Sequence, residues 1–239
     1  FVQYQNCLLG QDIAGSIDSI KKITAKDLKN NFDYFYRPEN CHLVLIGNFD
    51  IEQIYRFVKE TRSEFTISHK TVEKEKQPIE ENIQKLDSLQ MDISISKLAI
   101  GFKNVHFSDN YMRESILVQL LFNLLFGWTS PYYKNWYAEG KIDESMSIEY
   151  EVSSRYSFVI MTMDTAEPIR MSSLIRQVMT SADKQRLLTE EALDLQKKAL
   201  YGEFLRSLDN IQNLGSQYLA YSDDGKTYFD FGQELMSIV

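Results

Sequence analysis

Three histidines, His42, His69 and His106, are the residues of this chain best suited to bind a transition metal. A zinc site commonly takes two ligands from one helix face and a further carboxylate from elsewhere. No two of these histidines are close enough in sequence to share a helix face, and none has glutamate three residues later. His69 with Glu73 has the best spacing, but the highly charged stretch around them favours a solvated segment over a ligand pair. We expect His42 to be structural, His106 to lie in a loop, and no catalytic zinc to bind within these residues.

Other catalytic groups are equally sparse. Cys7 and Cys41 are the only cysteines and form no Cys-x-x-Cys pair, so the sequence predicts two reduced thiols. There is no glycine-rich phosphate loop, and no Ser-His-Asp or Cys-His arrangement can be assembled from the order of the residues. The sequence therefore favours a role other than catalysis by these 239 residues alone.

Composition narrows the class of protein further. A hydrophobic content of 44% is too high for a disordered chain, and a formal charge of −8 gives no support for nucleic-acid binding. An acidic surface suits either solubility or peptides that carry positive charge. The longest apolar run, residues 116–127, is interrupted by polar residues and is too short to span a bilayer. We expect a cytoplasmic protein without a membrane segment.

The elements that position any site begin with a predicted helix–strand–helix unit over residues 24–60. Thr24 is a good N-cap, and Pro38 ends the first helix because the residue before a proline is pushed out of the helical region. The apolar stretch 42–47 reads as a buried strand, and Asp50 caps the second helix. The apolar face expected for that helix consists of Ile54, Phe57 and Val58.

A change in composition follows. Residues 68–85 contain many charges of both signs and the central Pro78, which is typical of a linker. We therefore predict three parts: a closing segment of a first domain over 1–67, a linker over 68–85, and a second domain over 86–239.

The second domain alternates strands and helices in an order typical of an α+β fold, with a mostly antiparallel sheet and helices packed on one face. Tyr156 is expected in the core and Arg155 on the surface, because neighbouring residues of a strand face opposite sides. The predicted elements are a strand over 91–104, a buried helix from Asp109 or Asn110 to Gly127, a short helix from Pro131, strands over 145–152 and 156–165, and helices over 167–182 and 189–222.

Two segments of the chain echo each other. Residues 12–20, DIAGSIDSI, and residues 230–238, DFGQELMSI, share an initial aspartate and a final Ser-Ile. If the protein consists of two similar halves, the second copy ends just before its final helix and strand. The sequence then predicts an uncovered sheet edge and a tendency to associate.

Residues 12–54 resemble the closing segment of a first domain in the pitrilysin/insulinase family of zinc peptidases, and a weaker resemblance continues to residue 165. The sequence of this stretch is most similar in character to that of bacterial cytosolic members. The matching positions, in family order, are Gly15, Ser19-Ile20, Ile23-Thr24, Asp27-Leu28, Phe35-Tyr36, Pro38 with Asn40, and Gly47 with Asp50.

This resemblance implies a site that these residues only partly supply. The family holds zinc with His-x-x-Glu-His and a further glutamate, which the present residues lack, so the resemblance implies zinc in the parent protein and none in this part. Active members also carry an Arg and a Tyr seven residues apart that polarise the substrate carbonyl. In this chain, the position of the Arg is occupied by Tyr137. The position of the Tyr is occupied by Glu144, or by Asp143 if one residue is deleted.

Three functions remain open from the sequence. The chain is expected to be the non-catalytic C-terminal portion of a zinc metallopeptidase, which encloses and positions peptide substrates. The alternative is a catalytically inactive, peptidase-like scaffold or peptide-binding partner subunit, which the departures at Tyr137 and Glu144 favour. Either protein could pair with a homologous peptidase-like subunit. An unrelated α+β domain is the third hypothesis.

Overall fold

The computed structural model describes residues 10–63, 86–104, 108–153, 156–181, 186–221 and 225–238. A three-stranded antiparallel sheet is formed within residues 97–164, in the order β1-β3-β2. The three strands are β1 (Lys97–Asn104), β2 (Ser147–Val152) and β3 (Ser157–Asp164). Apolar and polar residues alternate along β2, which is typical of a strand with one buried face.

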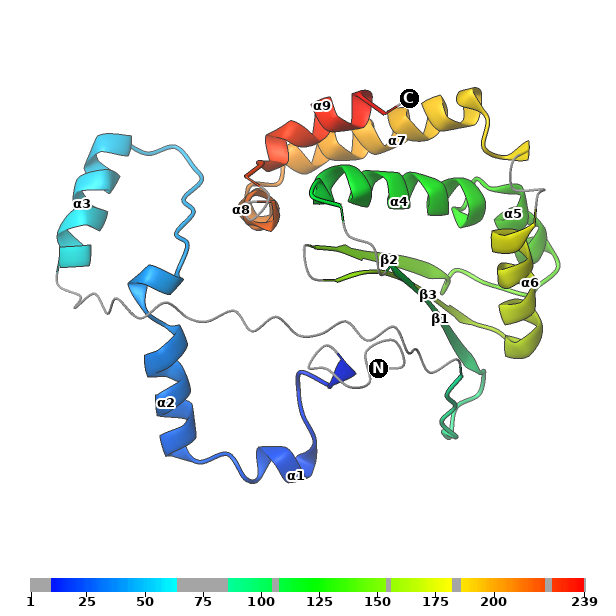
Figure 1. The fold of residues 1–239 in the computed structure, drawn as a ribbon, viewed down its shortest axis with the longest axis horizontal. Coiled ribbons are helices and arrows are strands. Elements are labelled where there is room, and N and C mark those ends of the chain that lie inside the picture. Colours follow the sequence, from blue (N-terminus) through cyan, green and yellow to red (C-terminus); the bar gives the residue numbers. More distant parts are fainter. Residues whose placement is uncertain are drawn as a thin grey trace.

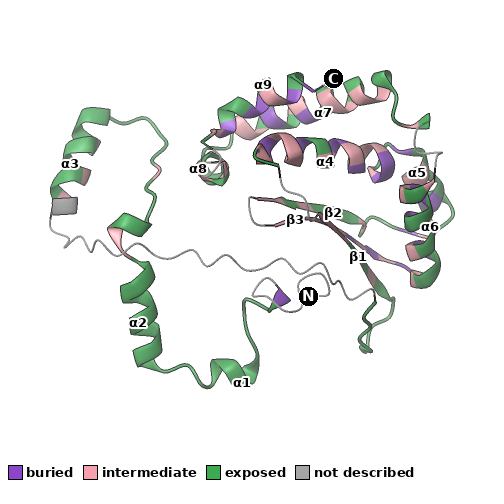
Figure 2. Cartoon of the chain, in the orientation of Figure 1, coloured by how far each residue is buried: buried purple, intermediate pink, exposed green. Residues whose placement is uncertain are grey.

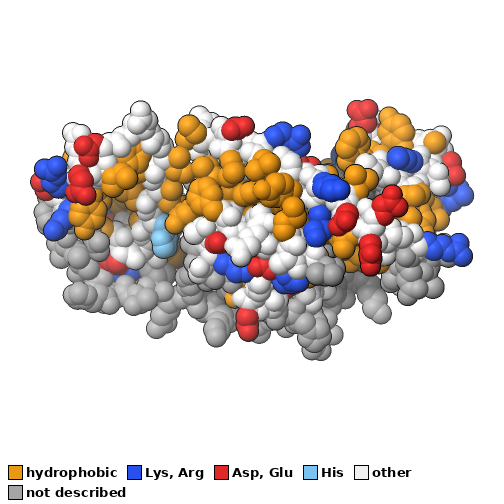
Figure 3. All heavy atoms as spheres, turned by 90° about the horizontal axis from the view of Figure 1, so that it is seen from above, with side chains coloured by type: hydrophobic (Ala, Val, Ile, Leu, Met, Phe, Trp, Pro, Cys, Tyr) orange, Lys and Arg blue, Asp and Glu red, His pale blue; other side chains and the backbone are white. Residues whose placement is uncertain are grey.

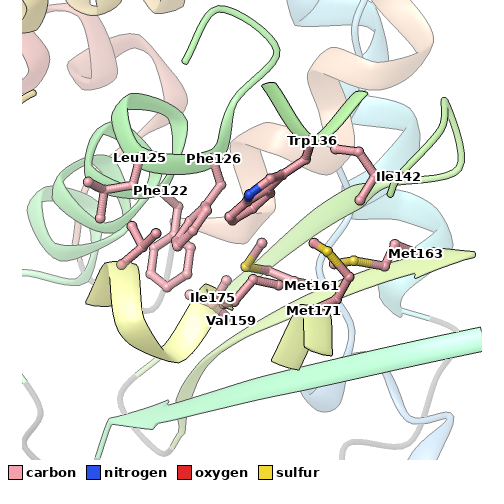
Figure 4. Close-up of a cluster of buried hydrophobic side chains, with 11 residues drawn as sticks. Phe122, Leu125, Phe126, Trp136, Ile142, Val159, Met161, Met163, Met171 and Ile175 are labelled. Carbon is pink, nitrogen blue, oxygen red and sulfur yellow. The ribbon is translucent and has the colours of Figure 1, made fainter. Parts of the chain in front are cut away.

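Helices pack on one face of this sheet, as the sequence predicted (Figure 1). Side chains from α4 (Tyr111–Phe126), α5 (Pro131–Ala138) and α6 (Pro168–Thr180) meet the inward residues of β3 in one apolar cluster (Figure 4). Met161 of β3 and Ile175 of α6 are fully buried there. The α+β architecture with a one-sided helical layer is therefore confirmed.

Helix α4 is apolar on nearly all sides because it lies between two layers. Phe122, Leu125 and Phe126 belong to the cluster over the sheet. Met112 and Ile116 belong to a second cluster, which α4 forms with α7 (Glu190–Leu208) and α9 (Phe231–Met236). Figure 1 shows α7 and α9 on the side of α4 away from the sheet. A helix buried on both sides needs no polar stripe.

Local capping signals set the ends of these helices. The Asn110 side chain accepts a hydrogen bond from the Arg113 N–H at 3.0 Å, so Asn110 rather than Asp109 caps α4. Gly127 ends α4, and Pro131 lies in the first turn of α5, as expected. The Thr189 side chain accepts from the Ala192 N–H and begins α7. Each prediction from a cap residue in this part of the chain is confirmed.

The single helix predicted over 189–222 is wrong. It is divided into α7 and α8 (Ile211–Ala220), because the Asn210 side chain accepts a hydrogen bond from the Asn213 N–H and caps a new helix. A 3-10 turn, η5 (Tyr228–Asp230), and α9 follow, which the sequence analysis did not anticipate. Gly232 lets α9 approach α7 closely, since a Cβ there would lie 3.1 Å from Tyr201 Cε2.

The N-terminal helices are much more exposed than the helices that pack on the sheet. They are α1 (Ile17–Ile20), α2 (Ala25–Phe35) and α3 (Ile51–Ser63), with a 3-10 turn, η2 (Pro38–Asn40), between α2 and α3. Thr24 and Asp27 form a reciprocal capping box at α2, and Asp50 caps α3 through the Gln53 N–H at 3.0 Å, as predicted. These helices are exposed almost throughout (Figure 2).

The strand predicted over 42–47 is not a strand in the structure. Cys41 is extended, with φ −116° and ψ 140°, but residues 41–46 pair with no described strand. Val44 and Ile46 instead approach α8, where a Cβ added to Gly215 would lie 3.8 and 3.7 Å from their side chains. A strand is completed only by hydrogen bonds to a neighbour, which this stretch lacks among the described residues.

Further differences concern burial and extent. On the predicted apolar face of α3, Phe57 is 64% exposed, whereas Ile54 and Val58 are half-buried. The strand predicted over 91–104 begins only at Lys97. The echoing segments 12–20 and 230–238 differ in backbone, because 231–236 are helical whereas Gly15 occupies a turn with φ +72°. The predicted linker, 68–85, lies outside the described residues.

None of the described helices combines the length and apolar character needed to cross a membrane.

Candidate functional site

The side of the sheet that no described helix covers is the candidate site. The cross-strand register places side chains there in rows that run from β1 through β3 to β2. We call this side the open face. Its rows are Lys103–Phe158–Glu151, Gly101–Ile160–Glu149, Ala99–Thr162–Ser147 and Lys97–Asp164.

Exposure separates the centre of the open face from its edges. Phe158 and Ile160 of β3 are half-buried, whereas Glu149 and Glu151 on β2 are exposed. Tyr156, which was expected in the core, stacks on Phe158 with ring centroids 5.9 Å apart. Because residues 156 and 158 point to the same side of the sheet, Tyr156 belongs to the open face and is only half-buried. Its neighbour Arg155 lies outside the described residues.

Some charged side chains of the open face form an ion pair with a described residue, and others do not. The Lys97 ammonium donates to both carboxylate oxygens of Asp164, at 2.8 and 2.9 Å, across the β1–β3 pair. Glu149 and Glu151 form no ion pair with any described residue. Within the described ranges, the two negative charges at the β2 edge therefore have no ion-pair partner.

Side-chain hydrogen bonds fix β2 and the loop that precedes it. The Tyr150 hydroxyl donates to Asn123 Oδ1 of α4 at 3.0 Å, and burial raises the pKa of Tyr150 far above its usual range, so the phenol remains a donor. The Asp164 N–H donates to Ser145 Oγ at 2.8 Å. The Thr165 hydroxyl donates to the Lys141 carbonyl at 2.8 Å. These bonds hold residues 141–145 against the end of β3.

The residues at the family's carbonyl-polarising positions lie near this loop. Tyr137 is on α5, 47% exposed, and stacks on Tyr133 with centroids 6.0 Å apart. Glu144 is exposed in the turn before β2. No hydrogen bond or ring contact joins these two residues in the described part of the chain. Hydrogen bonds from Ser145 hold the pKa of the neighbouring Asp143 below its usual range. The assignment of Tyr137 and Glu144 to a substrate site stays a prediction.

Metal ligands are not assembled in the described residues. No group of three or more His, Cys, Asp or Glu side chains in these ranges could hold a metal ion. His42 and Cys41 are exposed, while Cys7, His69 and His106 lie outside the described residues. The described side chains therefore do not fit a zinc site.

Sequence reasoning missed the edge glutamates, although a signal for them was present. The stretch SIEYEV places Glu149 and Glu151 two residues apart, which puts them on one side of a strand. Only the strand order identified that side as the open face and β2 as an edge.

Known proteins resemble this chain in both sequence and fold. Residues 22–200 match the model of the Peptidase M16 inactive domain. The chain is 27% identical over 224 residues to an uncharacterized zinc protease of Bacillus subtilis, YmfH, covering 92% of this chain and 52% of that protein. A probable zinc protease of Haemophilus influenzae, PqqL, is 30% identical over 99 residues, 41% of this chain and 10% of that protein.

Solved structures agree in fold. An M16-like peptidase from Alicyclobacillus acidocaldarius superposes with a TM-score of 0.81 at 23% identity, over 100% of this chain and 58% of that chain. A protease from Helicobacter pylori gives a TM-score of 0.70 at 17% identity, over 94% of this chain and 55% of that chain. The chain thus spans about half the length of the first of these relatives.

The family match covers most of the chain and agrees with the one-sided α+β domain and with the resemblance read from residues 12–54. This chain therefore belongs to the M16 peptidase family and carries the peptidase-like domain described as inactive.

Proposed function

We propose that this chain is the non-catalytic portion of an M16-type zinc peptidase and holds an extended peptide against the open face of its sheet. The observation that carries the proposal is the one-sided sheet, whose helices cover only the face opposite to Glu149 and Ile160. A sheet with a face that no described helix covers and an edge that no described strand pairs with can accept a further strand through main-chain hydrogen bonds.

The open face offers both kinds of contact that an extended peptide needs. Phe158 and Ile160 supply an apolar strip along the central strand, and β2 supplies an edge that is unpaired among the described residues. Main-chain pairing gives affinity without regard to sequence, while alternate side chains give selectivity. This division suits a protein that positions varied peptides.

Hydrolysis is assigned to the whole protein rather than to these residues. Two relatives are named zinc proteases, and the chain spans about half the length of the first of them. Zinc held by ligands outside the described residues would activate the water that attacks the peptide. This chain's own part is to bind and orient the peptide.

A second candidate is a peptidase-like scaffold without catalysis. The side chains at the carbonyl-polarising positions are Tyr137 and Glu144, where active members carry Arg and Tyr. A glutamate cannot donate a hydrogen bond to a developing oxyanion while ionised. This departure supports a protein that binds peptides and does not cut them.

Peptide binding to the purified chain tests the proposal. A fluorescein-labelled extended peptide of about ten residues should bind without cleavage, measured by anisotropy and mass spectrometry. Hydrogen exchange should slow in 147–152 when peptide is added, because an added strand protects edge amides. The absence of binding at millimolar peptide, or protection confined to the helices, would refute the open-face role.

The full-length protein separates the two candidates. Loaded with zinc, it should cleave the same peptide if it is a peptidase. A scaffold would bind the peptide with the same protection of 147–152 and leave it intact.

A further inference from the structure

The free edge of β2 has a defined set of outward backbone groups. The Ser153 N–H donates to the Tyr156 carbonyl at 2.8 Å, which identifies that pair as hydrogen-bonded across the hairpin. Hydrogen-bonded and non-hydrogen-bonded pairs alternate along an antiparallel ladder. The Glu151–Phe158 and Glu149–Ile160 pairs are then hydrogen-bonded within the sheet. The N–H and C=O groups of Ile148, Tyr150 and Val152 consequently point outward, where a further strand can reach them.

Glu149 and Glu151 stand between these outward groups. Their side chains lie on the open face, exposed and without an ion-pair partner among the described residues. A strand added in antiparallel orientation would bond to Ile148, Tyr150 and Val152, so its residues opposite the glutamates would form non-hydrogen-bonded pairs. Such pairs bring Cα atoms to about 4.5 Å and side chains closest together. The residue opposite each glutamate would therefore lie close to its negative charge.

We propose that the β2 edge selects peptides that carry Lys or Arg at two positions separated by one residue, opposite Glu149 and Glu151. This inference rests on the proposed peptide-holding function and assigns its substrate class. The intervening peptide side chains would point to the helical side, beside the inward residues Ile148 and Tyr150, where apolar groups fit. The occupant is an extended segment in which basic and apolar residues alternate.

The opposite edge of the sheet carries lysines where β2 carries glutamates, which argues for β2 as the basic-peptide edge. β1 presents Lys97 and Lys103 to the open face, and Lys97 is already paired with Asp164. A basic peptide beside β1 would meet like charge, which is unfavourable between directly opposed strand residues. Charge complementarity thus distinguishes the two edges.

Four labelled peptides test the proposal with the whole chain. The first peptide has two lysines separated by one valine and flanked by valines. The second replaces both lysines with Gln, and the third replaces them with Glu. The fourth keeps the lysines but is N-methylated at the amides that would bond to β2. The Lys peptide should bind about two- to thirtyfold more tightly than the Gln peptide, the range expected for two cross-strand charge pairs. The N-methylated peptide should bind far more weakly, because strand addition requires its amides.

Three double variants locate the effect. Glu149→Gln with Glu151→Gln should abolish the preference for Lys over Gln, and Glu149→Lys with Glu151→Lys should shift it to the Glu peptide. Glu190→Gln with Asp194→Asn, which changes the charge on α7 by the same amount as the Gln variant changes it on β2, should leave the preference intact. Persistence of the preference in the β2 variants would mean that net charge alone attracts basic peptides, and would overturn the proposal.

The remaining outcomes separate this inference from the proposed function. Equal binding of the Lys and Gln peptides, with loss on N-methylation, would leave strand addition standing and refute the basic substrate class. Aggregation of the β2 variants with unchanged peptide preference would assign the glutamates to protection of the edge, which also refutes it. Failure of every peptide to bind would refute peptide holding itself.

Discussion

Glu234 is the side chain through which α9 is joined to the start of α4. Its carboxylate accepts from Lys226 Nζ at 2.9 Å and from Arg113 Nη1 at 3.0 Å. The hydrogen bond from Lys226, with smaller contributions from Arg113 and Asn110, holds the pKa of Glu234 below its usual range. Lys226 also donates to Asn110 Oδ1, the cap of α4, at 2.6 Å. One acidic group thus connects the C-terminal residues around α9 to the start of α4.

A pH dependence follows from this carboxylate. A pKa that is lower in the folded than in the unfolded chain, where it is about 4.3, adds stability above that value. This stability is lost as the pH falls through the folded pKa. Glu234→Gln should lower the free energy of unfolding by about 1 kcal/mol at pH 7, and the difference from wild type should shrink toward pH 3. Urea unfolding of both proteins at several pH values measures this difference in the free energy of unfolding. Asp194→Asn, on exposed α7 surface, is the control, and a difference that does not vary with pH would contradict the assignment.

Asn210 provides a second test at the scale of one residue. Its side chain caps α8 through the Asn213 N–H at 3.1 Å. Asn210→Ala should cost about 1 kcal/mol of stability, whereas Asn210→Asp should be nearly neutral, because both Asn and Asp are good N-caps. Equal losses in the two variants, measured by urea unfolding, would show that the side chain acts other than as a cap.

At the scale of elements, the two faces of β3 explain how one strand serves both core and site. Met161 is fully buried under α4 and α6, and its neighbour Ile160 lies half-buried on the open face. Adjacent strand residues face opposite sides, so one backbone supports packing and presents a surface. Figure 3, seen from the opposite, helical side, shows apolar side chains gathered there as well.

This asymmetry predicts unequal costs of truncation. Met161→Ala should lower the free energy of unfolding by about 2–5 kcal/mol, since it leaves a cavity in a closely packed cluster. Ile160→Ala should cost less than half as much and should weaken peptide binding, because it removes part of the apolar strip. Comparable losses of stability in urea would mean that the open face is covered in solution.

At the scale of the whole molecule, two parts of the chain differ in how well they are covered. The sheet and α4–α9 enclose two buried clusters. In α2, Leu28 is 62% exposed and Phe32 is 57% exposed. Large apolar patches that are exposed on a surface are typical of sites of association.

Self-association is the expected consequence. Sedimentation of the isolated chain should show dimers or larger species at high concentration, and Leu28→Lys with Phe32→Glu should reduce them. Lys26→Glu with Lys29→Glu, which alters charge on the same helix, should have little effect. A strictly monomeric wild-type chain would argue against an interface on α2.

The predicted domain boundary has its own test. Limited proteolysis should cut first within 68–85, because that stretch is rich in charge and poor in core residues. Separation of fragments ending and beginning there, identified by mass, would support the division into 1–67 and 86–239. First cleavage between 114 and 127, inside α4, would contradict it.

Local chemistry allowed the sequence to determine much of this protein. Thr24, Asp50, Asn110 and Thr189 begin helices through side-chain hydrogen bonds to residues three positions away, so their signals are complete within a few residues. The sequence predicted the strand at 145–152 that contains β2, and nearly continuous apolar character identified α4 as buried, because such patterns reflect burial along a single element. The family resemblance rested on local motifs of the same kind.

Only the tertiary structure decided which surfaces were left uncovered. A strand is completed by a partner from elsewhere in the chain, so residues 42–47 had the pattern of a strand without becoming one. The strand order β1-β3-β2 determined that Glu149 and Glu151 lie at an edge, and the helices on the opposite face determined that they lie on the open one. Both facts depend on contacts between residues far apart in sequence, which no short pattern records.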